Sequence, residues 1–170
     1  RALWTCLGLS QALAGRHETA LASYRSALAI APDHIAVLLN LADSELALGR
    51  RSEAEAHYRR VLDRLAVLES AASLRPDDRL VKAQCLAHLG RAEEAVAIVQ
   101  QTLRQGPGSP DLVYAAALVY ALVGDRTSAL LNAREALRLG EGASWFRLAP
   151  FQFIRDDPEL RTQFSARALP

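Results

Sequence analysis

Residues 15–28 read GRHETALASYRSAL, and three further stretches of the chain repeat this pattern. They are GRRSEAEAHYRRVL at 49–62, GRAEEAVAIVQQTL at 90–103 and GDRTSALLNAREAL at 124–137. The four glycines follow one another at intervals of 34, 41 and 34 residues, and an alanine stands five residues after each glycine. Self-similarity at this period predicts stacked copies of one supersecondary unit.

Each copy has the apolar periodicity of two helices, one on either side of its glycine. Leucines recur at helical spacing before Gly15, and Ala20, Tyr24 and Ala27 do so after it. The glycine falls where the first helix must end, because the left-handed conformation that ends helices costs glycine least. The alanine falls where the two helices cross, and its small side chain lets their backbones approach. We therefore expect an all-α fold, an α-solenoid of four helical hairpins.

The repeat spacing predicts an array over residues 1–141, with hairpins at about 1–34, 35–75, 76–109 and 110–141. Pro32 and Pro107 each close a second helix, because proline cannot extend one. The 41-residue interval has seven extra residues, close to two helical turns, so we predict one long helix over 53–74. This extension is either a tolerated insertion or a support for a neighbouring domain.

Residues 142–170 depart from the repeat and are rich in aromatic side chains. Five of these are Trp145, Phe146, Phe151, Phe153 and Phe164. Asp157 before Pro158 predicts a helix start, with an N-cap followed by proline at the first helical position. We expect a C-terminal capping helix that covers the apolar end of the last hairpin. The alternative is that this aromatic segment is a docking surface for another chain.

Composition and charge exclude several classes of partner. The formal charge of +1 gives no field to attract nucleic acid or an anionic membrane surface. The sequence has no apolar run of the ~18 residues that a spanning helix needs, so we predict no membrane insertion. Cys6 and Cys85 lie far apart in apolar helical stretches, which indicates buried free thiols and favours a reducing, cytoplasmic location. A periplasmic location stays open.

The sequence offers no candidate catalytic, metal or cofactor site. Its four histidines are separated by 17, 23 and 31 residues, without a helical metal pair or a nearby cysteine. The serines of the alanine-rich helices lack the strand-to-helix turn of a nucleophile. The segment GPGSP at 106–110 lacks the lysine of a phosphate-binding loop. We therefore expect no enzyme activity, no bound metal and no cofactor.

The first unit resembles the tetratricopeptide repeat (TPR). Its residues match the TPR sequence pattern, except that Gln11 stands where the pattern has a tyrosine. The matching residues are Trp4, Leu7, Gly8, Ala20, Tyr24, Ala27 and Pro32. The likeness weakens in later units but extends to about residue 141, and it implies a right-handed superhelix. The tail, through DDPEL at 156–160, resembles the endings of repeat modules on bacterial serine/threonine kinases, nucleotide cyclases and transcriptional regulators.

The resemblance implies a non-catalytic scaffold for protein–protein interaction. The alternative is an intramolecular regulatory domain of a larger bacterial signalling enzyme such as a serine/threonine kinase, with another domain of the same polypeptide as partner. The chain contains no methionine and begins inside the first unit, so we expect it to be a fragment of a longer protein.

In this family the first helix of each hairpin lines a concave groove that binds a peptide or protein segment. The resemblance places nine residues there: Thr5, Leu9, Leu39, Asn40, Asp43, Gln84, His88, Tyr114 and Leu118. Members that clamp an acidic peptide terminus use Lys, Arg and Asn at these positions, and only Asn40 fits, so we predict no carboxylate clamp. The apolar residues of the set favour an apolar or amphipathic segment. Alternatively, other parts of the polypeptide or a second copy fill the groove.

Overall fold

The computed structural model describes residues 2–72, 74–105, 108–155, 157 and 160, with only the backbone described for Arg147 and Arg155. These residues form helices and no strand, as predicted. The chain divides into two compact units, unit 1 at Arg1–Leu74 and unit 2 at Arg75–Pro170. The handedness of a superhelix stays a prediction.

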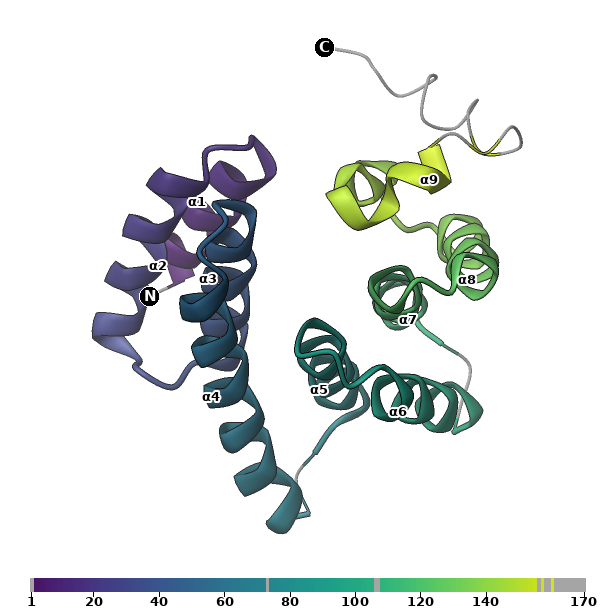
Figure 1. Ribbon diagram of the computed structural model, residues 1–170, viewed down its shortest axis with the longest axis horizontal. Coiled ribbons are helices and arrows are strands. Elements are labelled where there is room, and N and C mark those ends of the chain that lie inside the picture. The colour runs from purple at the N-terminus through teal and green to yellow at the C-terminus, as the bar shows by residue number, and fades with distance from the viewer. Residues whose placement is uncertain (1, 73, 106–107, 156, 158–159, 161–170) are drawn as a thin grey trace. The chain divides into compact units, whose positions relative to one another are not determined.

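Unit 1 consists of two helical hairpins (Figure 1). The first pairs α1 (Ala2–Leu13) with α2 (His17–Ile30), and the second pairs α3 (Ile35–Ala47) with α4 (Arg51–Ser70). The two hairpins stack because α2 packs against α3. The two first helices, α1 and α3, also contact each other.

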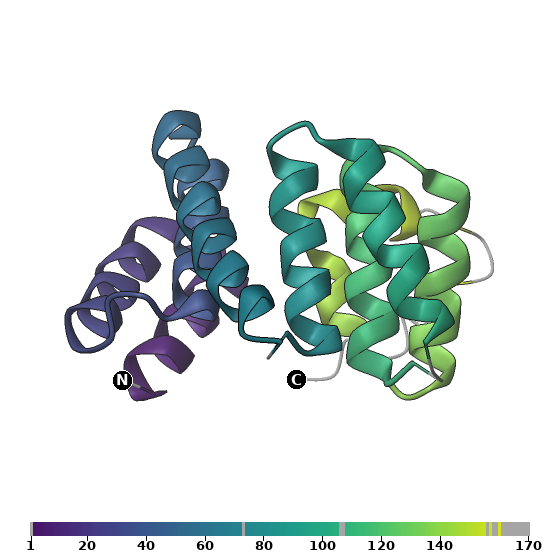
Figure 2. The same cartoon turned by 90° about the horizontal axis from the view of Figure 1, so that it is seen from below.

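Unit 2 contains two more hairpins and part of the aromatic segment (Figure 2). The hairpins are α5 (Pro76–His88) with α6 (Ala92–Arg104), and α7 (Pro110–Val123) with α8 (Arg126–Arg138). They stack through contacts of α7 with α5 and α6. Two short 3-10 helices, η1 (Ala143–Arg147) and η2 (Ala149–Phe151), and α9 (Gln152–Arg155) follow, with η2 packed on α7 and α9 on α8.

The turn inside every hairpin is built on the predicted glycine. All four glycines adopt positive φ angles of 73–84°: Gly15, Gly49, Gly90 and Gly124. The N–H after each glycine donates to the carbonyl oxygen five residues earlier, at 2.9 Å in every case. This is the Schellman arrangement, which satisfies a carbonyl left open at the helix end and requires a left-handed residue. The prediction that these glycines end the first helices is confirmed.

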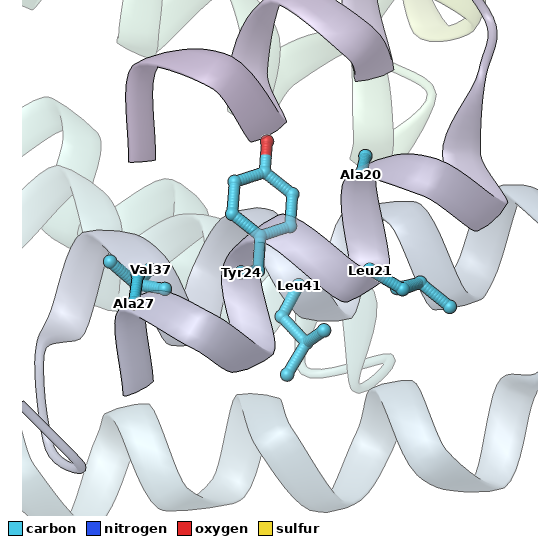
Figure 3. Close-up of a cluster of buried hydrophobic side chains, with 6 residues drawn as sticks. All are labelled: Ala20, Leu21, Tyr24, Ala27, Val37 and Leu41. Carbon is cyan, nitrogen blue, oxygen red and sulfur yellow. The ribbon is translucent and has the colours of Figure 1, made fainter. Parts of the chain in front are cut away.

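The small residues of the repeat lie where the helices of a hairpin cross. The alanines five residues after the glycines are all fully buried: Ala20, Ala54, Ala95 and Ala129. In hairpin 1, Gly8 of α1 faces the ring of Tyr24, and a Cβ added there would lie 2.5 Å from Tyr24 Cε1. Tyr24 continues into a buried cluster with Leu21, Val37 and Leu41 that joins α2 to α3 (Figure 3). The unit is thus held by close approach within the hairpin and by apolar packing between hairpins.

The long helix is shorter than predicted. It runs over Arg51–Ser70 rather than 53–74, so it starts two residues earlier and ends four residues earlier. After Ser70 the chain leaves the helix through Ala72, which adopts a φ of 53°, and the Ala72 N–H donates to the Glu69 carbonyl oxygen. A left-handed residue ends the helix here as glycine does elsewhere, but alanine gives no sequence signal for this ending.

Three predictions concern residues whose placement is not described. The helix predicted after Asp157 falls on residues 158–170, which lie outside the described residues except for Leu160. Pro107 and Phe164 also lie outside them. Within the described part, the Asp157 carboxylate accepts the Leu160 N–H at 3.3 Å, as an N-cap does. Among the described helices, none combines the length and apolarity needed to cross a membrane.

Candidate partner-binding surfaces

The candidate groove residues of unit 1 lie on its two first helices. Thr5 and Leu9 of α1 are half-buried, as are Asn40 and Asp43 of α3, whereas Leu39 is buried. The Asp43 carboxylate accepts a hydrogen bond of 2.7 Å from the Tyr58 hydroxyl of α4. Helix α4, the second helix of hairpin 2, therefore fixes the orientation of the Asp43 carboxylate on the first helix, α3.

Asp43 also influences the tyrosine of hairpin 1. Burial raises the pKa of the Tyr24 hydroxyl, and the negative charge of Asp43 raises it further. Within the described structure the Tyr24 oxygen is buried without a hydrogen-bond partner. The carboxylate of Asp43 is thus the negative group of this surface, with a tyrosine of each hairpin near it.

The candidate groove residues of unit 2 lie on α5 and α7. Gln84 and His88 of α5 are half-buried, and Leu118 of α7 is buried. Tyr114 of α7 is half-buried but packs against the aromatic segment. The structure places the nine predicted residues on the first helices, five in unit 1 and four in unit 2, and the predicted binding role stays untested.

Tyr114 belongs to a cluster of four aromatic rings, which we call the aromatic cluster. Its ring centroid lies 5.3 Å from Phe146, 5.6 Å from Phe151 and 6.2 Å from Trp145. The Phe146 and Phe151 centroids are 5.0 Å apart, and both side chains are fully buried. The Tyr114 hydroxyl donates to the Trp145 carbonyl oxygen at 3.4 Å. The chain's own C-terminal segment therefore covers Tyr114.

The stability of the protein should fall in mild acid because of His88. Burial lowers the pKa of His88 to about 4 from an ordinary value of 6.5. Between these two values the unfolded chain binds the proton more readily, so this contribution is lost as the pH falls from 6.5 towards 4. We expect a loss of about 2 kcal/mol in unfolding free energy from pH 7 to pH 5.

Urea unfolding at both pH values checks this prediction in the wild type and in His88→Gln. The variant has no titrating group at this position, so its loss between pH 7 and pH 5 should be smaller by about the same 2 kcal/mol. An equal loss in the two proteins would contradict the assignment to His88.

A polar pair inside hairpin 2 is absent from the sequence predictions. His57 Nδ1 of α4 lies 2.8 Å from Glu45 Oε2 of α3, and the Glu45 side chain is only 3% exposed. In hairpin 1 the residues 34 positions earlier form the matching contact, because the Ser23 hydroxyl donates to Gln11 Oε1 at 2.8 Å. The repeat register could have revealed both pairs. Their shared position, between the helices of a hairpin, gives them a structural role.

A cleft of about 450 Å³ lies on the outer side of α8. Arg126 stacks 5.4 Å from the centroid of the Phe153 ring, and Arg134 pairs with Asp157 at 3.3 Å. The described lining also includes Thr127, Leu130 and Leu131. The cleft therefore combines apolar side chains with Arg126 and the Arg134–Asp157 pair, and Phe153 of the aromatic segment forms part of its lining.

The cysteines and the metal-ligating residue types form no cluster. Cys85 is buried as predicted, but Cys6 is exposed. The prediction of a buried thiol at Cys6 is therefore wrong. Across the described ranges, no group of three or more His, Cys, Asp or Glu side chains could hold a metal ion.

Comparison with known proteins identifies the repeat. Residues 11–75 match the family model described as tetratricopeptide repeat. This part of the chain is a tetratricopeptide repeat (TPR) segment. No curated protein matches the sequence. TPR arrays are in general non-catalytic scaffolds for protein–protein interaction.

Three solved structures similar to this chain are described as TPR proteins, and each has low sequence identity to it. A thermophilic TPR protein from Thermus thermophilus is 22% identical, with 97% of each chain covered and a TM-score of 0.56, so the two share the fold. A TPR protein from Parabacteroides merdae is 22% identical, with 98% of this chain and 74% of that chain covered and a TM-score of 0.40. YrrB, described as a TPR protein with an unusual peptide-binding site, is 19% identical, with 84% and 87% covered and a TM-score of 0.37.

Proposed function

We propose that this chain binds a peptide or protein segment along the first helices of its hairpins and performs no chemistry itself. One observation carries the proposal. On α3, the half-buried Asn40 and Asp43 stand beside apolar Leu39, and the Tyr58 hydroxyl holds the Asp43 carboxylate in place at 2.7 Å. A few fixed polar groups within an apolar surface give a binding site both affinity and orientation.

The charges of this surface define the segment that it would accept. Asp43 supplies a carboxylate, and Asn40 supplies an amide that can pair with a peptide backbone. In unit 2, the lowered pKa keeps His88 neutral at physiological pH, and Gln84 is uncharged, so α5 adds no positive charge at these positions. An apolar or amphipathic segment with a basic residue opposite Asp43 fits best, and an acidic terminus does not.

The alternative function is regulation within one polypeptide, in which another domain supplies the bound segment. The DDPEL turn favours it through its resemblance to kinase-attached modules. Asp157 of this segment pairs with Arg134 of α8 at 3.3 Å. If this alternative holds, the peptides selected below should bind the complete polypeptide more weakly than they bind this chain, because its own domain competes.

A phage-displayed library of random peptides, selected on the wild-type chain, tests the binding proposal. The selected peptides should carry apolar residues and at least one Lys or Arg. Asn40→Arg should weaken the binding of these peptides at least about tenfold in a titration, because it places a positive charge in the site that repels their Lys or Arg. Ala56→Arg is the matched control, since Ala56 is exposed on the second helix α4. The proposal fails if no peptide is selected, or if Ala56→Arg weakens binding as much as Asn40→Arg does.

A further inference from the structure

The outer side of α1 exposes large apolar side chains without a covering helix. Leu3 is 86% exposed, Trp4 43% and Leu7 44%, and we call these three residues the α1 patch. The helix Ala2–Leu13 contains no charged residue, and Gly8 alone among its residues is buried. By contrast α3 and α7 each bury seven residues. Helix α1 thus has the composition of an interior helix but the exposure of a surface one.

The repeat register shows how the same positions behave in other hairpins. In α3 the residues 34 positions after the patch are Val37, Leu38 and Leu41, with exposures of 0%, 0% and 2%. In α7 the corresponding residues are Leu112, Val113 and Ala116, with exposures of 8%, 6% and 0%. These positions are therefore apolar and buried in α3 and α7 but exposed in α1, whereas in α5 they are the charged residues Asp78, Arg79 and Lys82, of which Asp78 is buried.

The structure also shows what covers these positions. Val37 and Leu41 of α3 pack in one buried cluster with Leu21 and Tyr24 of α2, with Leu28 packed at its edge. Likewise α7 packs against α6. In α3 the cover is the second helix of the preceding hairpin, which presents apolar residues at i, i+3 and i+7.

We propose that the α1 patch docks an amphipathic helix of a partner that carries the apolar face of α2. The occupant has apolar side chains at the spacing of Leu21, Tyr24 and Leu28 and no charge within that face, because α1 offers no ion to pair with one. Among the described helices, the corresponding faces of α2 and α6 already pack on α3 and α7.

This surface differs from the groove of the proposed function. Leu3 and Leu7 precede the groove residues Thr5 and Leu9 by two positions, which is roughly 200° around an α-helix. The patch and the groove thus lie on different faces of α1. A failure of either proposal leaves the other standing, and a groove substitution such as Asn40→Arg serves as a control for the patch.

Trp4 itself reports on docking. In a Trp145→Phe background it is the remaining tryptophan, because the chain has two. The probe is a synthetic peptide of residues 17–30, HETALASYRSALAI, titrated into this protein while tryptophan emission is recorded. We expect a saturable blue shift as Trp4 is covered. A peptide with Leu21→Ser and Leu28→Ser should give no shift over the same range.

Protein variants provide the matched test. The double substitution Leu3→Glu with Leu7→Glu should weaken the binding of the peptide at least about tenfold, because each substitution places a charge in the apolar contact. Both side chains are exposed, so circular dichroism should show unchanged helix content. Val67→Glu, at a valine 55% exposed on α4, should leave binding unchanged. The proposal is overturned if Trp4 emission does not shift on adding the peptide, or if the Leu21→Ser, Leu28→Ser peptide gives the same shift. It is also overturned if the emission shifts with increasing protein concentration in the absence of peptide, because a second copy of the chain then covers the patch.

Discussion

Replacing Phe151 with alanine is expected to lower the unfolding free energy of unit 2 by about 4 kcal/mol. The Phe151 side chain is fully buried, and its ring lies 5.0 Å from that of Phe146 and 5.6 Å from that of Tyr114. The substitution removes the apolar contacts of a complete ring and leaves a cavity beneath η2. It also removes two ring pairs, each of which contributes beyond its buried area. The effect should therefore lie at the upper end for a large-to-small change.

Urea unfolding followed by far- and near-ultraviolet circular dichroism measures this loss. Phe153→Ala is the matched control, because Phe153 is half-buried and its described ring contact is the exposed Arg126. Its cost should stay below about 1 kcal/mol. Equal costs for the two substitutions would mean that the aromatic segment does not pack on α7 in solution.

The aromatic cluster also changes the choice of substitutions that test the groove. The sequence analysis places Tyr114 in the groove, where replacement by arginine would be a natural test of binding. In the structure its hydroxyl donates to Trp145 and its ring contacts Phe146. An arginine there would disturb packing as well as binding. Asn40 and Gln84 are the more informative positions, because each is half-buried and polar.

The repeat register was predictable because each of its residues solves a local problem. Glycine at Gly15 and at its three equivalents ends a helix in the left-handed conformation, and this requirement does not depend on neighbouring hairpins. Alanine at Ala20 and its equivalents permits close helix crossing, which is also a property of the single hairpin. Such local requirements leave a repeating signal that can be read from sequence.

The features that were not predictable depend on contacts between distant segments. The sequence predicts that the aromatic segment covers the last hairpin, but nothing near Tyr114 identifies it as the residue that Trp145, Phe146 and Phe151 contact. Cys6 lies in an apolar helix, which favours a core position, but its side chain is exposed in the structure. The early end of α4 depends on Ala72, a residue type that seldom adopts positive φ. Neither periodicity nor composition reports on these contacts.

Enlarging an alanine at the helix crossing should be the second most damaging change. Ala95→Leu is expected to lower the unfolding free energy of unit 2 by about 3 kcal/mol. Ala95 of α6 is fully buried, and three additional carbon atoms have no space where α6 crosses α5. Leucine is nearly as good a helix former as alanine, so propensity contributes little to the loss. The cost comes from forcing the two helices apart.

Ala97→Leu makes the same change two residues further along α6, where the side chain is exposed. The equivalent position of hairpin 4 is Leu131, which is 69% exposed, so the fold already accommodates leucine there. We expect a change within about 0.5 kcal/mol for this control. Urea unfolding of the two variants against the wild type compares them directly. A similar loss for both would attribute the effect to leucine in α6 in general and would contradict a crossing at Ala95.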